Sequence, residues 1–259
     1  KHQQENEHVI LEPGVGFTLV KKLLKLNSKK TPIDVILLSR NSADTGLRIF
    51  NSIEHYDLNI SRAAFTRGES THPFVGAFEA DLFLSSNYND VQKALQSGYA
   101  AASIVESKSN NSHPSQLRIA FDGDAVIFSD ESERIFQEKG LEAFHENEIL
   151  SEKIELKAGP FKSFLVSLQK IQSTFPEEDN PIRTALVTAR SAPSHRRVIH
   201  TMRKWGIRID ESFFLGGLEK GVFLRQFAAD IFFDDQQQHC ESASQYVPTG
   251  HVPSGIKNS

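Results

Sequence analysis

The sequence is poor in cysteine, in long apolar runs and in surplus charge of either sign. Cys240 is the single cysteine among 259 residues, so these residues form no internal disulfide and no cysteine-based zinc site. The longest apolar stretches, such as Val35–Leu38, are strand-length and fall far short of the roughly 20 residues that span a bilayer. A formal charge of −4 offers no basic field to a polyanion. We therefore expect a cytoplasmic protein that binds neither a membrane nor a nucleic-acid polymer.

The length bounds the architecture. Single hydrophobic cores stop growing at about 250 to 300 residues, so 259 residues of ordinary composition, 39% hydrophobic and 24% charged, suggest two domains or one large α/β unit. The first residue is Lys1 and not methionine. We expect the sequence to belong to a longer gene product.

Short apolar runs rich in β-formers alternate with segments of helical period, which is typical of βαβ units around a parallel sheet. This pattern predicts an α/β fold. Strands are expected at Asp34–Ser39, Arg62–Thr66, Asp81–Ser85, Ala101–Val105, Leu117–Phe121, Thr184–Thr188, Ser212–Leu215 and Asp230–Asp234, and helices at Gly46–Tyr56, Tyr88–Gln96, Glu131–Lys139, Phe161–Thr174, His195–Trp205 and Lys220–Phe227.

The chain repeats itself at an offset of 149 residues. Pro32–Ser86 aligns with Pro181–Asp235 without a gap, and 14 of the 55 aligned positions are identical. Any two βαβ units share some of this pattern, but an ungapped match of this length favours an internal duplication. We therefore expect two related α/β halves, 1–105 and 117–259, joined by a polar linker at 106–116.

The two halves differ in their chemistry. The second half has Asp234 where the first has Ser85, and it has Lys220 where the first has Thr71. The carboxylates and the amine are thus kept in one copy only, and we expect the first half to be a degenerate one.

In the second half, polar side chains follow successive predicted strands, at the edge where ligand sites of open α/β sheets lie. Carboxylates suit a hard cation such as Mg²⁺, whereas an ammonium and a hydroxyl suit phosphate oxygens. A carboxylate two residues from another can act as a general acid beside a nucleophile. The set indicates phosphoryl transfer and consists of Asp122, Asp124, Thr188, Lys220, Asp234 and Asp235.

Each of these residues also has a structural interpretation. Asp-Gly-Asp is common in turns, and Thr188 fits a strand-end hydroxyl that caps the following helix. Lys220 fits a solvated helix residue, and Asp234-Asp235 fits a helix cap. The occurrence of all of them in one order along the chain favours the functional interpretation.

Four sequence motifs carry a resemblance to a known superfamily. Phe121–Val126, Leu186–Thr188, Lys220 and Asp230–Asp235 resemble, in this order, the motifs of the haloacid-dehalogenase-like phosphohydrolases. Beyond these motifs, the sequence is similar to that of the cytosolic 5′-nucleotidase I family over nearly the whole chain, including Leu38–Gly46, Phe65–Gly68, Thr188–Pro193 and Phe214–Gly217. The resemblance implies a Rossmann-like parallel sheet of the haloacid-dehalogenase type with a small helical cap at about 129–158.

The resemblance implies a reaction on nucleoside 5′-monophosphates. Asp122 would attack the phosphorus and become a phospho-aspartate, and Lys220 would pair with Asp122 and keep it ionised. Asp124 would protonate the leaving 5′-oxygen and later deprotonate the attacking water. Thr188 and Lys220 would hold phosphoryl oxygens.

The resemblance also implies Mg²⁺ as the cofactor. The ion would bind Asp122, the backbone carbonyl of Asp124 and a carboxylate of the fourth motif, offsetting charge that repels an approaching phosphate. Asp234 and Asp235 both follow the strand directly, so the sequence does not rank them as ligands.

Substrate specificity has two candidate sources. A cap as short as 129–158 leaves a site accessible, so we consider Ser39, Arg40 and Asn41 of the degenerate half as substrate-binding residues, with a pure packing role as the alternative. Arg190 and His195, just past Thr188, are the second source, for phosphate or base, although an exposed pair at a helix start explains them at least as well. Ser191 is a further candidate for substrate binding.

Other functions remain open from sequence. One is a phosphatase or phosphotransferase for another small phosphomonoester, such as a sugar phosphate. Another is a receiver-like signalling domain, although there the acidic pair precedes the phosphorylated aspartate, and here the order is reversed. Self-association is also left open.

Overall fold

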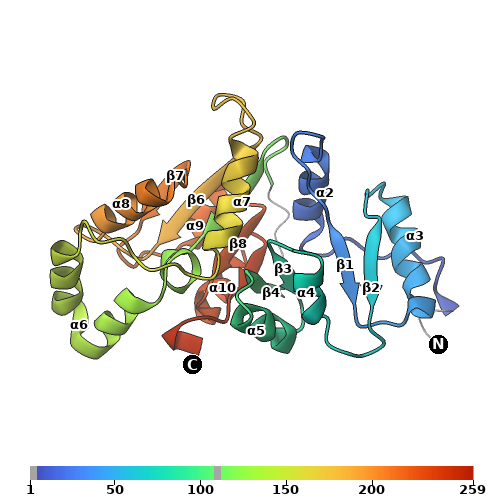
Figure 1. Ribbon diagram of the computed structural model, residues 1–259, viewed down its shortest axis with the longest axis horizontal. Coiled ribbons are helices and arrows are strands. Elements are labelled where there is room, and N and C mark those ends of the chain that lie inside the picture. Colours follow the sequence, from blue (N-terminus) through green and yellow to red (C-terminus); the bar gives the residue numbers. More distant parts are fainter. Residues whose placement is uncertain (1–4, 108–111, 259) are drawn as a thin grey trace. The chain divides into compact units, whose positions relative to one another are not determined.

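Figure 1 shows the computed structural model, which describes residues 5–107 and 112–258. The chain forms two compact units, Lys1–Ala80 and Asp81–Ser259. The segment 81–105, which we expected in the first half, therefore belongs to the larger unit. Of the expected linker 106–116, residues 108–111 lie outside the described residues.

The smaller unit holds a two-stranded parallel sheet formed by β1 (Ile36–Ser39) and β2 (Arg62–Phe65). A turn (η1) and helix α3 connect these strands, as in a βαβ crossover. From residue 5 onward, this unit also contains the helices α2 and α4. The bounds are η1 Ala43–Gly46, α3 Leu47–His55, α2 Phe17–Leu26 and α4 Pro73–Ala77.

The larger unit is built on a seven-stranded sheet with the strand order β3-β4-β9-β8-β5-β6-β7. All neighbours are parallel except β4 and β9, which pair antiparallel. The prediction of an α/β fold around a mostly parallel sheet is confirmed, while β9 and its antiparallel pairing were not predicted. The bounds are β3 Phe83–Ser85, β4 Ala101–Val105, β5 Leu117–Phe121, β6 Ile182–Thr188, β7 Glu211–Phe214, β8 Ile231–Asp234 and β9 Thr249–His251.

Helices connect these strands (Figure 1). None in the described parts of the chain has the length and apolarity needed to cross a bilayer. The bounds in the larger unit are α5 Tyr88–Gln96, α6 Glu131–Leu150, α7 Lys162–Gln172, α8 His195–Trp205, α9 Gly221–Phe227 and α10 Gln237–Ala243, with short turns η2 Gly123–Ile127 and η3 Ile256–Asn258.

The centre of the sheet is buried on both faces. Strands β5, β6 and β8 are almost entirely buried, as expected where helices cover both sides of a parallel sheet. The ring of Phe233 lies 5.7 Å from that of Phe121 and 4.7 Å from that of Phe161. This packing gives the carboxyl ends of the central strands a rigid base.

The expected cap segment, 129–158, contains α6, which breaks at Gly140 (φ 82°, ψ −178°) into two helical legs (Figure 1). The segment leaves and returns through a bridge between Phe128 and Ala158. A Cβ on Gly159 would lie 2.3 Å from the backbone oxygen of Phe128, so this return needs a glycine. The helix expected at Glu131–Lys139 corresponds to the first of these legs, and the second leg reaches Leu150.

Candidate active site

Three neighbouring strands bring the predicted motifs together. Phe121 of β5 pairs with Phe233 of β8 and with Leu186 of β6. The backbone N–H of Asp122 donates to the carbonyl of Phe233 at 2.8 Å, which extends this pairing by one residue. The first, second and fourth motifs therefore end side by side at one edge of the sheet, as the sequence predicted.

Three carboxylates meet at this edge. One oxygen each from Asp122, Asp234 and Asp235 lies within 4.8 Å of the others, and all three residues are buried. Asp122 directly follows β5, Asp234 is the last residue of β8, and Asp235 comes next in the sequence. The side chain of Asp124 lies outside this group of three among the described residues.

Lys220 reaches two of these carboxylates. Its Nζ donates to Asp234 Oδ2 at 2.6 Å and lies 2.8 Å from Asp122 Oδ1. Burial alone would lower the pKa of Lys220, but Asp122 and Asp234 outweigh it and raise the pKa above its usual value. Lys220 is therefore a permanent cation at the centre of the site.

The carboxylates differ in their ionisation. Burial raises the pKa of Asp122 to about 6, with Lys220 opposing this shift. Burial and the charges of Asp122 and Asp234 raise the pKa of Asp235 to about 9. Burial would also raise the pKa of Asp234, but Lys220 and His239 outweigh it and hold that pKa at about 2. Of the three carboxyl groups, Asp235 is therefore the one that keeps its proton at neutral pH, while Asp234 carries a negative charge.

Thr188 lies beside the first motif. A Cβ on Gly123 would be 3.3 Å from Thr188 Oγ1, so the missing side chain brings the loop backbone close to this hydroxyl. Thr188 Oγ1 also accepts a hydrogen bond from the backbone N–H of Arg190 at 3.2 Å. The hydroxyl is thus held at the same edge as the carboxylates.

Asp124 is paired with Arg190. The Arg190 guanidinium donates to both carboxylate oxygens of Asp124, at 2.7 and 2.8 Å, and to Glu148 at 2.6 Å. Arg190 is only 4% exposed. The structure brings Arg190 to the site as the partner of two carboxylates.

The other predicted substrate-binding residues come from both compact units. Ser39, Arg40 and Asn41 belong to the smaller unit, where Ser39 ends β1 and its Oγ accepts from the N–H of Asn41 at 3.1 Å. Ser191 follows Arg190, and its Cβ lies 3.4 Å from where a Cβ on Gly216 would be. Their part in substrate binding stays a prediction.

Sequence reasoning missed His239, whose Nδ1 lies 3.4 Å from Asp234 Oδ2. His239 also lines a pocket of about 220 Å³ together with Lys220, Ala189 and Gly217. No spacing signal marks His239, because α10 brings it to β8 only in the folded chain. A larger hollow of about 690 Å³ against α7 does not include the carboxylates in its lining.

The donor set fits a hard divalent cation. Three buried carboxylate oxygens are ligands that Mg²⁺ prefers. The raised pKa of Asp235 is what clustered carboxylates show in the absence of a compensating positive charge. The arrangement therefore has both the ligands and the uncompensated charge that a metal would require.

Comparisons with known proteins agree with this geometry. Human cytosolic 5′-nucleotidase 1B is 39% identical over 259 residues, an alignment that covers 95% of this chain and 42% of the relative. The chain thus spans less than half of the length of that relative. No solved structure matches the chain. The family model of the 5′-nucleotidases matches residues 1–259, which confirms the resemblance seen in the motifs, and the chain belongs to the 5′-nucleotidase family.

Proposed function

We propose that the protein hydrolyses nucleoside 5′-monophosphates to nucleoside and phosphate, with Mg²⁺ as cofactor and a phospho-aspartate on Asp122 as intermediate. The observation that carries the proposal is the contact of Lys220 with both Asp122 and Asp234 at the edge where three carboxylates meet. Family membership and the name of the human relative support the choice of substrate.

Asp122 is the proposed nucleophile. Its Oδ1 lies 2.8 Å from Lys220 Nζ, and this cation favours the ionised carboxylate that can attack phosphorus. In the first step a bond forms between the Asp122 carboxylate and phosphorus, and the bond to the nucleoside 5′-oxygen breaks. In the second step a water molecule attacks the phosphorus and releases Asp122 and inorganic phosphate.

Asp124 is the proposed general acid and base. It lies two residues after Asp122, and its carboxylate is held in one orientation by Arg190. The form that Arg190 holds is the carboxylate, so Asp124 would first take up a proton from solvent and then give it to the leaving 5′-oxygen. It would then take a proton from the attacking water. Thr188 and Lys220 would hold the phosphoryl oxygens, a role for which a hydroxyl and an ammonium are suited.

Asp122, Asp234 and Asp235 would hold Mg²⁺, together with the backbone carbonyl of Asp124. A bound divalent cation supplies positive charge that offsets the repulsion between the carboxylates and the phosphate. We also propose a cytoplasmic location, on the word "cytosolic" in the name of the relative.

We propose that Ser191, next to Arg190 at the same sheet edge, contacts the substrate. Ser39, Arg40 and Asn41 remain candidates from the smaller unit.

Phosphate release from a panel of substrates tests the proposal. Purified protein is mixed with purine and pyrimidine 5′-monophosphates, sugar phosphates and Mg²⁺. We expect release from the nucleotides, loss of activity in EDTA and recovery on adding Mg²⁺, with no effect of a zinc-selective chelator. Full activity in metal-free buffer contradicts the proposed role of Mg²⁺. Phosphate release from sugar phosphates alone supports the alternative of a phosphatase for another small phosphomonoester.

A further inference from the structure

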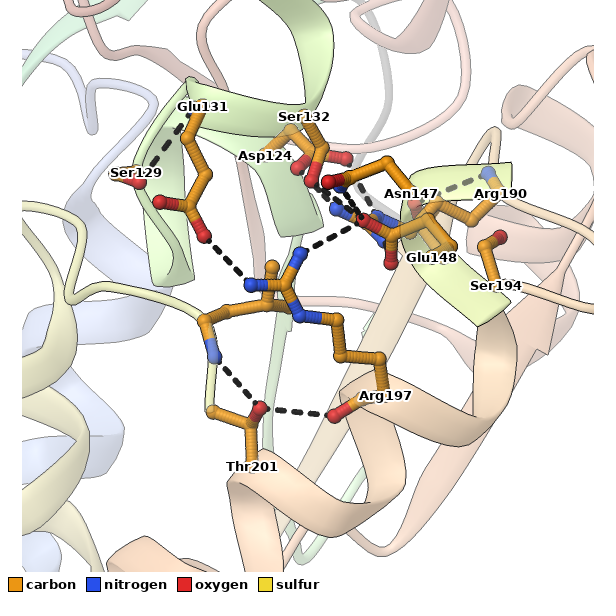
Figure 2. Close-up of polar contacts among 12 residues, drawn as sticks. Asp124, Ser129, Glu131, Ser132, Asn147, Glu148, Arg190, Ser194, Arg197 and Thr201 are labelled. Carbon is orange, nitrogen blue, oxygen red and sulfur yellow. Dashed lines mark hydrogen bonds and ion pairs between the residues drawn. The ribbon is translucent and has the colours of Figure 1, made fainter. Parts of the chain in front are cut away.

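A chain of alternating charges links the site to α6. In Figure 2 it runs from Asp124 through Arg190, Glu148 and Arg197 to Glu131. Each of the four links is an ion pair with a closest approach of 3.0 Å or less. This row of ion pairs thus connects Asp124 of the first motif to α6.

Arg190 fixes the direction of the Asp124 carboxylate. Its Nε and Nη2 donate to Asp124 Oδ2 and Oδ1 at 2.8 and 2.7 Å, a two-point contact that determines the plane of the carboxylate. The backbone of Arg190 is itself anchored, because its N–H donates to Thr188 Oγ1 and its carbonyl accepts from the N–H of Gly216.

Glu148 fixes Arg190 in turn. It comes from the second leg of α6, its side chain is 0% exposed, and its Oε2 accepts from Arg190 Nη1 at 2.6 Å. Its Oε1 accepts from Arg197 Nη1 at 2.9 Å and from Ser132 Oγ of the first leg at 2.9 Å. Both oxygens of this carboxylate are therefore used, as a buried charge requires.

Glu148 also keeps two cations in place. The guanidinium groups of Arg190 and Arg197 each face one oxygen of the same carboxylate. Burial alone would lower the pKa of Arg190, but Asp124 and Glu148 outweigh it, so Arg190 stays charged. Without the charge of Glu148, the two guanidinium groups would repel each other across the space that it fills.

Arg197 secures the α6 segment without touching Asp124. Its Nη2 donates to Glu131 Oε1 at 3.0 Å and its Nε to the carbonyl of Ile154 at 2.9 Å. Thr201 of α8 also holds this segment, because its Oγ1 accepts from the N–H of Leu156 at 3.0 Å. The contact of Glu148 with Arg190 is therefore not needed to attach the α6 segment to α8.

We propose that Glu148 and Arg190 are positioning residues for the acid–base step: Glu148 orients Arg190, and Arg190 orients the carboxylate of Asp124. This inference rests on the proposed function, because it needs Asp124 to transfer a proton to the leaving 5′-oxygen. It assigns α6 a role in catalysis through Glu148, which acts on Asp124 by way of Arg190.

The test compares Glu148→Gln with Glu131→Gln, the same carboxylate-to-amide change at the other end of the charged chain. Each protein is assayed with a nucleoside 5′-monophosphate and with the analogue in which sulfur replaces the bridging 5′-oxygen, since a thiolate leaves without protonation. We expect Glu148→Gln to lower kcat/KM for the oxygen substrate about 10- to 100-fold, as is typical for supporting residues. The loss for the sulfur analogue and for Glu131→Gln should stay within about threefold.

Folding is checked for both variants by circular dichroism and thermal unfolding. If Glu148→Gln does not fold, Arg190→Lys replaces it, because lysine keeps the charge but cannot contact both oxygens of Asp124 in the same plane. The same selective loss on the oxygen substrate is expected.

Two results overturn the inference while leaving the proposed function intact. One is equal activity of Glu148→Gln and wild type on the nucleotide. The other is an equal loss on both substrates, which a purely structural role would produce. If wild-type protein releases no phosphate from any nucleotide in the presence of Mg²⁺, the proposed function itself fails.

Discussion

Lys220 is the residue on which the electrostatics of the site depends. Its ammonium touches Asp122 and Asp234, whereas Asp235 has no such contact with it at ion-pair distance. One buried cation among three buried carboxylates leaves an excess of negative charge. Lys220 therefore favours the ionised form of Asp122, whereas ionised Asp235 would be repelled by the neighbouring carboxylates. A bound divalent cation would offset this repulsion.

The nucleophile is tested by Asp122→Asn. We expect turnover to fall to background, because an amide cannot attack phosphorus and an acyl phosphate cannot form. The thermal unfolding temperature should stay close to that of wild type, since the amide oxygen still accepts from Lys220. Phosphate release is the measurement, on protein shown to be folded. Substantial release by the folded variant would exclude Asp122 as the nucleophile.

The stored repulsion is tested by Asp235→Asn in metal-free protein. The pKa of Asp235 is raised on folding to about 9, so its contribution to stability is fully present below the unfolded pKa and is lost as the pH rises towards 9. At pH 8 we expect the metal-free variant to be more stable than metal-free wild type, by about 1 kcal/mol or more, the equivalent of one pKa unit. Urea unfolding from pH 5 to pH 9 measures this.

Adding Mg²⁺ provides the control for that experiment. It should stabilise wild type more than Asp235→Asn, because the variant lacks one proposed ligand. A metal-free variant that is less stable than wild type at pH 8 would show that the Asp235 charge is compensated in the fold.

At the scale of single residues, the sequence predicted the motif residues but not the contact between Glu148 and Arg190 behind Asp124. Asp122 directly follows β5, Thr188 and Asp234 end β6 and β8, and parallel strands bring their carboxyl ends to one edge. Glu148 and Arg190 meet across 42 residues of chain. No local periodicity encodes a contact between a helix leg and a loop after a distant strand, so only the folded structure pairs them.

At the scale of elements, segments with a clear strand or helix pattern were predicted well and short or irregular ones were not. The expected bounds of β5, α5 and α8 agree with the structure. Strand β9 has only the residues Thr249–His251, with a glycine at its centre, which leaves too few side chains to show an alternation. Its antiparallel pairing with β4 depends on chain path and not on local pattern.

The entry and exit of the α6 segment depend on Gly159. An added Cβ there would meet the carbonyl oxygens of Phe128 and Val126 at 2.3 and 2.5 Å, and backbone cannot move aside as a side chain can. We expect Gly159→Ala to cost about 1 to 3 kcal/mol of unfolding free energy, the usual range for overpacking. Urea denaturation gives the value.

Gly16→Ala is the matched control for this change, because nothing lies within 4 Å of a Cβ at that position. A loss for Gly159→Ala no greater than the change for Gly16→Ala would show that the bridge between Phe128 and Ala158 adjusts freely.

At the scale of the whole molecule, the 149-residue offset reappears in the strand pairing. Ile36 pairs with Arg62 through to Ser39 with Phe65, and at the same offset Ala185 pairs with Glu211 through to Thr188 with Phe214. Within the larger unit, β3, α5 and β4 follow one another as β8, α10 and β9 do, with both strand pairs parallel. The pair β1 and β2 thus corresponds to β6 and β7, and the pair β3 and β4 corresponds to β8 and β9.

The backbone repeats at the same offset. Asp57, Arg67, Gly68 and Glu79 have positive φ, and so do Gly206, Gly216, Gly217 and Ala228. The hydroxyl of Ser39 accepts from the N–H two residues on, as does that of Thr188. Positive φ at a non-glycine residue is uncommon, so the match at Glu79 and Ala228 is not explained by a shared βαβ pattern alone.

We propose that these segments arose by duplication and that only the second copy kept a metal site. Ser85, Ser103, His251 and Asp234 form one row across the sheet, and β4 and β9 run in opposite directions. A local twofold rotation through the Ser103–His251 pair would therefore place Ser85 on Asp234.

An experimental structure with Mg²⁺ tests this relation. We expect 83–96 to superpose on 232–245, and 36–65 on 185–214, with every residue paired at the offset of 149. Metal density should lie among the three carboxylates and not beside Ser85, because a hydroxyl carries no charge to compensate a divalent cation. A closer fit at another offset, or metal beside Ser85, would contradict the duplication or the assignment of catalysis to the second copy.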